Sequence, residues 1–403
     1  MYDFDTVIDR RHTFSLKYDF YESRGYGADA LPFWIADMDF KTAPCITDAL
    51  RRAVDHGIFG YAEMEDSYFD AVRQWNRRFF RWDVQKEWLV KTPGVVPALN
   101  TALRAFTKPD DAVLIQPPVY QCFASAIENN GRRTVKSPLI RRGKKYSMND
   151  LDDIERKIVE NNVKLCFLCS PQNPTGRVWT REELSQYSAI CRRHHVLIVV
   201  DEIHADFTYP GYRHTAFGTL GEADAMNAVI CTAPTKTFNI SGLQDANIWI
   251  PNPELRAAFR KELTASGIIH PPLMGLVAGR AAYAGGKAWL DELKEYLLRN
   301  LNYVRNFLSA NLPYIKLVEP EGTYLLWLDF RYYGYYGLTD TALEMKIRSD
   351  ARLWTNMGNV FGTEGSGYVR LNIACPRATL EEGMNRLYEA FKSQKPSATP
   401  YFL

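Results

Sequence analysis

The feature that most constrains the fold is an alternation of short apolar runs with amphipathic stretches in the middle of the chain. Four such runs, rich in β-branched residues, cover residues 111–118, 163–171, 195–202 and 227–234. Each run ends in a turn signal and precedes a segment with apolar residues at helical spacing. Continuous apolar strands that alternate with helices are typical of a parallel sheet covered on both faces. The pattern therefore predicts an α/β fold with a mostly parallel central sheet.

Two further segments refine this prediction. Thr180, followed three residues later by Glu183, predicts a capping box at the start of a helix after the second run. The last third predicts a smaller α+β part, built from a long helix over 287–312, strands at 323–330 and 367–374, and a helix over 342–351. We therefore expect a large domain over 46–283 and a small domain made of 1–45 and 284–403.

Composition excludes several classes of protein. The 403 residues are 46% apolar and 24% charged, with a net charge of +2, which does not favour a nucleic-acid or membrane-surface binder. No stretch reaches the ~18 apolar residues of a membrane span. The first residues lack the apolar region of a secretory signal, so we expect a cytoplasmic protein. Residues 393–403 have the composition of a loose tail.

The cysteines do not indicate a metal or disulfide framework. There are seven, an odd number, scattered along a long chain. Cys166 and Cys169 form a C-x-x-C motif inside an apolar run, but no second pair or adjacent histidine completes a metal site. We expect no metal.

Four chemically distinct side chains follow the predicted strands. Tyr120, Asn173 and Lys236 each come shortly after one of the apolar runs, and Asp201 follows the apolar residues 196–200 of the remaining run. Ligands of open parallel sheets bind beyond the carboxyl ends of the strands. Taken singly, these residues could be a core ring, a turn residue, a helix cap and a surface lysine. Those readings do not explain why all four follow successive strands.

Amino-acid chemistry on pyridoxal 5′-phosphate (PLP) needs this set. A lysine carries the cofactor, a carboxylate keeps the pyridine nitrogen protonated, and an aromatic ring stacks on the cofactor. The phosphate needs free backbone N–H groups at a helix N-terminus. Gly94, leading into a predicted helix, is a candidate for that role, although many helices begin this way.

Four ordered motifs, SPQNPTG, DEIHADF, APTKTFNISGL and GYVRLNIACPR, carry a family resemblance that spans nearly the whole chain. The chain resembles the fold-type I PLP-dependent enzymes of the aspartate aminotransferase superfamily. It is most similar to the MalY/PatB-type cystathionine β-lyases, or cysteine C–S lyases, through LPFWIADMDF, FGYAEMEDSYFDAV, PGVVPALN and EPEGTYLLWLDFR. The resemblance implies a PLP-binding large domain and a homodimer.

The resemblance also implies roles for individual residues. Lys236 would carry the cofactor and shuttle the proton, and Arg370 would grip the substrate carboxylate with its planar fork. The backbone at Ile35 and Ala36 would close over that carboxylate. The other implied cofactor contacts are Val95, Val96, Tyr120, Asn173, Asp201, Thr235 and, from a second subunit, Tyr61.

Four positions depart from the family pattern, and one of them, Thr235, replaces the usual serine but keeps the hydroxyl donor. His204 stands where many aminotransferases have a tyrosine, so it is either a cofactor contact or a packed neighbour. Gln244 replaces a phosphate-binding arginine, which leaves the phosphate to backbone dipoles and hydroxyls. Gln121 follows Tyr120 where some relatives have a second tyrosine.

The resemblance implies a β-elimination that converts L-cystathionine or other S-substituted L-cysteines to a thiol, pyruvate and ammonia. An aminotransferase would use the same cofactor and lysine, and no single residue separates the two. A non-catalytic PLP-binding regulator is a further alternative, disfavoured by the intact set of Lys236, Asp201, Asn173 and Arg370.

Overall fold

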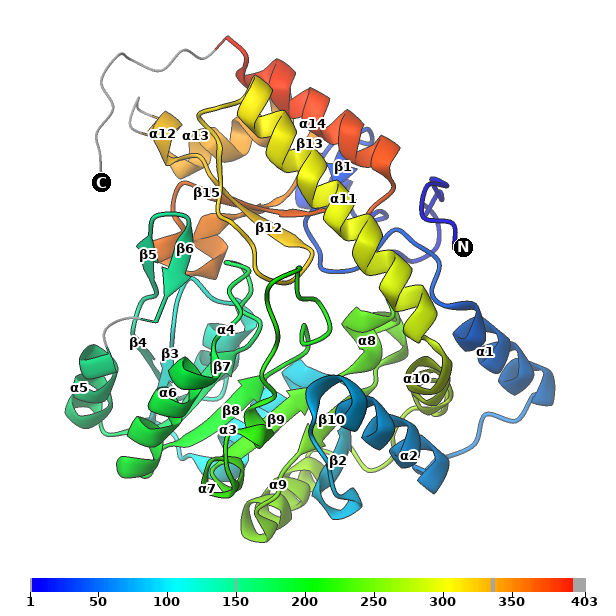
Figure 1. The fold of residues 1–403 in the computed structure, drawn as a ribbon, viewed down its shortest axis with the longest axis vertical. Coiled ribbons are helices and arrows are strands. Elements are labelled where there is room, and N and C mark those ends of the chain that lie inside the picture. The colour runs from blue at the N-terminus through cyan, green and yellow to red at the C-terminus, as the bar shows by residue number, and fades with distance from the viewer. Residues whose placement is uncertain (1, 149–150, 335–337, 394–403) are drawn as a thin grey trace.

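A seven-stranded sheet forms the centre of the molecule. The computed structural model describes residues 2–148, 151–334 and 338–393. The strand order is β2-β10-β9-β8-β7-β3-β4, and the five strands from β9 to β4 are parallel. Only β10, beside β9, runs against its neighbours (Figure 1). The strands are β2 (Leu89–Thr92), β3 (Ala112–Ile115), β4 (Arg133–Lys136), β7 (Val163–Cys169), β8 (Leu197–Asp201), β9 (Ala228–Thr232) and β10 (Ala246–Trp249).

Alternate residues of the central strands face two separate cores. In β8, Ile198 and Val200 belong to one core while Leu197 and Val199 belong to the other, as the two-residue period of a strand requires. The second core is covered by α3 (Val95–Phe106), α4 (Cys122–Asn129) and α9 (Pro253–Ala265). The first is covered by α2 (Asp66–Trp75), α5 (Leu151–Asn161), α6 (Arg181–Arg193) and α10 (Leu273–Gly285). Burial on both faces explains why these strands are apolar throughout.

The C-terminal third forms a second, antiparallel sheet in the order β11-β12-β15-β14. The buried side chains of this sheet belong to the first of the two cores described above, so that core is continuous across both sheets. The long helix α11 (Lys287–Asn311) runs beside this sheet down to α10 (Figure 1). The other elements here are β11 (Lys316–Leu317), β12 (Leu325–Asp329), α12 (Arg331–Gly334), α13 (Asp340–Met345), β13 (Leu353–Trp354), β14 (Asn356–Met357), β15 (Tyr368–Asn372) and α14 (Arg377–Phe391).

The N-terminal arm reaches this C-terminal part. Strand β1 (Leu31–Pro32) pairs in parallel with β13. Helix α1 (Pro44–His56) follows and contacts α10. Short elements complete the chain: the hairpin of β5 (Ile140–Arg142) and β6 (Lys145–Ser147), and helices α7 (Glu222–Met226) and α8 (Pro234–Thr237).

The predicted elements are confirmed. All four apolar runs form parallel strands, and the Thr180–Glu183 capping box is present at the start of α6. The helix expected over 342–351 consists of α13 followed by a π-helical turn, Lys346–Asp350. The domain boundaries stay a prediction, and all but the first residue of the expected tail, 394–403, lies outside the described residues.

The C-x-x-C motif is divided by the sheet. Cys166 and Cys169 both lie in β7, but Cys166 belongs to the first core and Cys169 to the second. Residues three apart in a strand point to opposite faces, so these two thiols cannot hold one metal ion together. All seven cysteines are free thiols.

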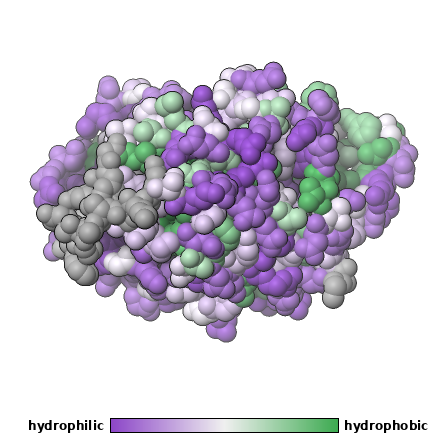
Figure 2. All heavy atoms as spheres, turned by 90° about the horizontal axis from the view of Figure 1, so that it is seen from above, coloured by the Kyte–Doolittle hydropathy of each residue, from purple (hydrophilic) through white to green (hydrophobic). Residues whose placement is uncertain are grey.

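The surface is mainly hydrophilic on the face shown in Figure 2, and hydrophobic side chains gather at the end where α1 lies. Large exposed apolar or aromatic residues at this end are Val54, Ile58, Phe59 and Tyr61. None of the helices in the described ranges is long and apolar enough to cross a membrane.

Candidate active site

The parallel register brings the strand-end residues to one edge of the sheet. Asp201 is the last residue of β8 and pairs with Cys169 of β7 and Cys231 of β9. Asn173 follows β7 by four residues, and Lys236 follows β9 by four. The clustering predicted for Asn173, Asp201 and Lys236 therefore has its geometric basis in strands that end side by side.

Lys236 lies in the short helix α8 and points toward the N-terminal arm. Its Nζ donates to the carbonyl oxygen of Ala36 at 2.7 Å and lies 3.4 Å from Oγ of Ser241. Burial lowers the pKa of the Lys236 amine; the negative charge of Asp37 opposes this shift, and the positive charge of Arg370 adds to it. The position therefore favours a neutral, nucleophilic amine.

Asp201 is a buried carboxylate without a cationic hydrogen-bond partner in the described chain. Only 4% of it is exposed, and its Oδ1 accepts from the backbone N–H of Ile203 at 3.0 Å. Burial raises the pKa of Asp201 to about 6, against the opposing charge of Lys236. A cation placed beside this carboxylate would stabilise its ionised form.

Arg370 enters the same region from β15 of the antiparallel sheet. It is 3% exposed, and Nη1 donates to Oδ1 of Asn173 at 3.0 Å. Nη2 donates to the carbonyl of Trp34 at 2.5 Å and to Oδ1 of Asn356 at 2.7 Å. Its Nε has no hydrogen-bond partner among the described residues. Burial lowers the pKa of Arg370 to about 10, so the guanidinium remains charged at neutral pH.

The aromatic and imidazole groups complete the cluster. Burial raises the pKa of Tyr120 above its usual range, and the charges of Asp201 and Arg370 also act on this residue. His204 is 3% exposed and packs edge-on against Tyr324, with ring centroids 5.9 Å apart. Burial lowers the pKa of His204 to about 3, an effect that the charges of Lys236 and Arg370 reinforce. His204 is therefore a neutral imidazole.

A helix N-terminus offers free backbone donors. Val95 and Val96 form the first turn of α3 after Gly94, and no side chain caps this helix. First-turn N–H groups have no partner within their own helix and favour an anion. Thr235, in α8 immediately before Lys236, is 7% exposed.

Tyr61 is not part of the Lys236 cluster within one chain. Its side chain is 94% exposed, and its ring lies 5.2 Å from that of His270. The two residues line a surface groove that also includes Phe59, Pro93 and Ile269.

Sequence reasoning missed three residues that contact or surround the lysine: Asp37, Ser241 and Tyr324. The Tyr324 hydroxyl donates to the Ala36 carbonyl at 3.2 Å, beside the Lys236 contact. Asp37 forms an ion pair with Arg10 at 2.9 Å; although burial alone would raise the pKa of Asp37, the charges of Lys17 and Arg10 hold it below its usual value. All three residues stand inside the motifs that carry the resemblance. The one available sequence signal was the five-residue spacing of Ser241 from Lys236.

The fold and these side chains define an α/β protein of the fold-type I class. An amine, a carboxylate and a guanidinium meet where the central sheet faces the C-terminal one. The chain belongs to the aminotransferase class I and II family, whose model matches residues 29–387.

Known proteins are similar over nearly the full length. The chain is 41% identical to the cystathionine β-lyase PatB of Bacillus subtilis, over 96% of this chain and 99% of PatB. It is 35% identical to the protein MalY of Escherichia coli, over 98% of this chain and 100% of MalY. Among solved structures, the PLP-bound C–S lyase of Staphylococcus hominis, complexed with the inhibitor L-cycloserine, has a TM-score of 0.90 at 32% identity, with 96% of this chain and 98% of that chain covered.

Proposed function

We propose that the protein is a PLP-dependent C–S β-lyase. It cleaves L-cystathionine, or another S-substituted L-cysteine, with one water molecule, to a thiol, pyruvate and ammonia. The observation that carries this proposal is the Lys236 amine, with its pKa lowered by burial, beside the charges of Asp201 and Arg370. The full-length similarity to a cystathionine β-lyase and to a PLP-bound C–S lyase supports it.

The donor set fits PLP. The Lys236 amine can bind the aldehyde carbon, and the buried Asp201 carboxylate can face a protonated ring nitrogen. Asn173 and Tyr120 would hold and stack on the ring. The uncapped N–H groups of Val95 and Val96, with the Thr235 hydroxyl, would bind the phosphate. His204 would pack beside this set as a neutral ring.

The residues divide the chemistry between binding and proton transfer. Bound PLP supplies an electron sink for the carbanion formed at the substrate α-carbon. Asp201 holds the ring nitrogen in its protonated form, and Arg370 binds the substrate carboxylate through its guanidinium fork. Ile35 and Ala36 border that carboxylate through their backbone. Lys236, released as a free amine, removes the α-proton at Nζ, and a lowered pKa suits that task near neutral pH.

The active form is a homodimer in this proposal. Tyr61 is 94% exposed on the end that also exposes Val54, Ile58 and Phe59. Such a patch, at one end of a face that is mainly hydrophilic, fits a second copy of the chain, which would carry Tyr61 to the partner's phosphate. The large domain over 46–283, the small domain and a cytoplasmic location belong to the same proposal.

The decisive experiment is an assay of the purified, PLP-loaded protein with L-cystathionine. Pyruvate, ammonia and free thiol are measured with and without an added 2-oxo acid. Equal amounts of pyruvate and thiol without the acceptor are expected. Consumption of amino acid only when the acceptor is present would overturn the lyase assignment in favour of an aminotransferase.

A further inference from the structure

The segment Trp34–Phe40, which we name the strap, touches both ends of the reacting region. Its Ala36 carbonyl accepts from Lys236 Nζ at 2.7 Å, and its Trp34 carbonyl accepts from Arg370 at 2.5 Å. The strap therefore spans from the amine that handles the proton to the guanidinium that grips the substrate. Contacts that hold the strap therefore also fix the position of the Lys236 amine relative to the Arg370 guanidinium.

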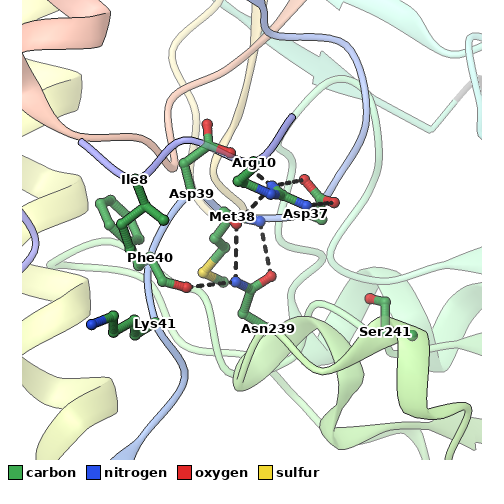
Figure 3. Close-up of a pocket in the computed structure, with 10 residues that line it drawn as sticks. Ile8, Arg10, Asp37, Met38, Asp39, Phe40, Lys41, Asn239 and Ser241 are labelled. Carbon is green, nitrogen blue, oxygen red and sulfur yellow. Dashed lines mark hydrogen bonds and ion pairs between the residues drawn. The ribbon is translucent and has the colours of Figure 1, made fainter. Parts of the chain in front are cut away.

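Asn239 holds the strap from the side of Lys236. It lies two residues after α8, and its side-chain amide makes three hydrogen bonds to the strap backbone (Figure 3). Oδ1 accepts from the N–H of Met38 at 2.9 Å, and Nδ2 donates to the carbonyls of Met38 at 3.0 Å and Phe40 at 2.9 Å. Thr42 adds a fourth bond, from its hydroxyl to the carbonyl of Phe238 at 2.6 Å.

The chemistry of this position calls for asparagine. Asn239 has φ of 55°, a left-handed conformation that asparagine and glycine adopt more readily than other residues. Both hydrogens and the oxygen of its amide are used. An aspartate of the same shape could not donate and would place its charge against two carbonyl oxygens.

The strap is also held on both sides of Ala36 by residues other than Asn239. Asn372, two residues after Arg370 on β15, donates from Nδ2 to the carbonyls of Ile35 and Asp37, each at 2.7 Å. Arg10 binds the Asp37 carboxylate through both terminal nitrogens, at 3.1 and 2.9 Å. Arg10 Nη1 also donates to the Met38 carbonyl at 3.1 Å. Loss of Asn239 would therefore loosen the Met38–Phe40 side of the strap, next to Ala36, while the bonds to Trp34, Ile35 and Asp37 stay in place.

We propose that Asn239 is a positioning residue for the lysine. By holding the strap, it places the Ala36 carbonyl where it orients the free amine of Lys236 for proton transfer. The expected effect on the rate of elimination rests on the proposed function. The position of the amine is a property of the protein itself.

Asn239→Gly tests the inference, because glycine keeps the left-handed backbone and removes the amide. Small misplacements of a catalytic group cost up to about 100-fold in rate, so we expect kcat for elimination to fall about 10- to 100-fold. KM should change much less, since the Arg370 end remains held. The matched control is Asn162→Gly, which removes an asparagine with φ of 51° in the turn before β7.

A second readout does not depend on turnover. The protein without cofactor is treated with acetic anhydride, and acetylation of Lys236 relative to the exposed Lys261 is followed by mass spectrometry. A loosened strap should make Lys236 react faster in Asn239→Gly and Asn239→Asp, but not in Asn162→Gly. If Asn239→Gly does not fold, Thr42→Val, which removes one bond, should produce a smaller change in the same direction.

The outcomes separate this inference from the proposed function. Wild-type kcat and an unchanged Lys236 acetylation rate in Asn239→Gly would overturn the positioning role. The same loss of kcat in Asn162→Gly would also overturn it. Absence of elimination by the wild-type enzyme would refute the proposed function, while faster acetylation of Lys236 in the variant would still support the positioning role.

Discussion

Replacing Arg370 by lysine isolates the role of its planar fork. Arg370 donates to Asn173, Trp34 and Asn356, and its Nε has no partner among the residues that the structure describes. In the proposed function, the guanidinium also binds the substrate carboxylate. A lysine keeps a positive charge but presents one ammonium group in place of two parallel donors.

The expected loss follows from the number of bonds. A hydrogen bond to a charged group contributes about 1.5–3 kcal/mol. Loss of one such bond to the substrate carboxylate should raise KM for L-cystathionine about 10- to 150-fold, at about 1.4 kcal/mol per tenfold change. The effect on kcat should be smaller, because Lys236 is unchanged.

The variant should also acquire a pH dependence that the wild type lacks. Burial lowers the pKa of Arg370 to about 10, so the wild-type guanidinium stays charged from pH 7 to 9. Lysine has an ordinary pKa about 2 units below that of arginine, so the same burial should bring its pKa closer to this pH range. Because only the charged form binds a carboxylate well, KM of Arg370→Lys should rise as the pH increases through this range.

Steady-state kinetics at pH 7, 8 and 9 test both statements. Arg73→Lys is the control, since Arg73 pairs with Asp83 at 2.7 Å in an exposed ion pair on α2, away from the site. Melting temperatures of all three proteins check folding. A KM of Arg370→Lys within twofold of the wild type at every pH would refute the assigned role of Arg370.

The other predictions concern Lys236, Asp201 and Tyr61. Lys236→Ala should abolish elimination and leave PLP bound without a covalent link, as absorbance and mass spectrometry would show; normal turnover would contradict the central assignment. Ionised Asp201 destabilises the protein without cofactor, because its pKa rises from 3.8 to about 6 on folding. Asp201→Asn should therefore stabilise that form by up to about 3 kcal/mol at pH 8, and by little near pH 4, where the Asp201 carboxyl is protonated in the folded protein; urea unfolding at the two pH values measures this, and a gain that does not grow with pH would refute the reasoning. Tyr61→Phe should weaken PLP retention about tenfold or more, by loss of one hydrogen bond to the phosphate; an unchanged PLP dissociation constant would remove the argument for a shared site.

Much of the large sheet could be predicted because its signal is local. The four apolar runs are buried on both faces, so their sequence is continuously hydrophobic and easy to recognise. The capping box of α6 was equally local, since Thr180 and Glu183 satisfy each other's backbone groups. The edge strands β2 and β4, and β10 beside β2, were not predicted. Each is only four residues long, without a distinguishing pattern.

The sequence by itself determined which chemical groups follow the strands. Lys236, Asp201 and Asn173 could be placed at one edge because parallel strands end on the same side. Their electrostatic state could not be predicted. The lowered pKa of Lys236 and the raised pKa of Asp201 both come from burial, which depends on elements distant in the chain.

Tertiary structure alone decided how the N-terminal arm meets the site. Ala36 contacts Lys236 across 200 residues, and Asn372 holds the strap across 335 residues or more. Such contacts join backbone carbonyls to side chains, and a backbone carbonyl carries no residue-specific signal in the sequence. The chain therefore shows in its sequence what chemistry it contains, while long-range packing sets the position and charge of each group.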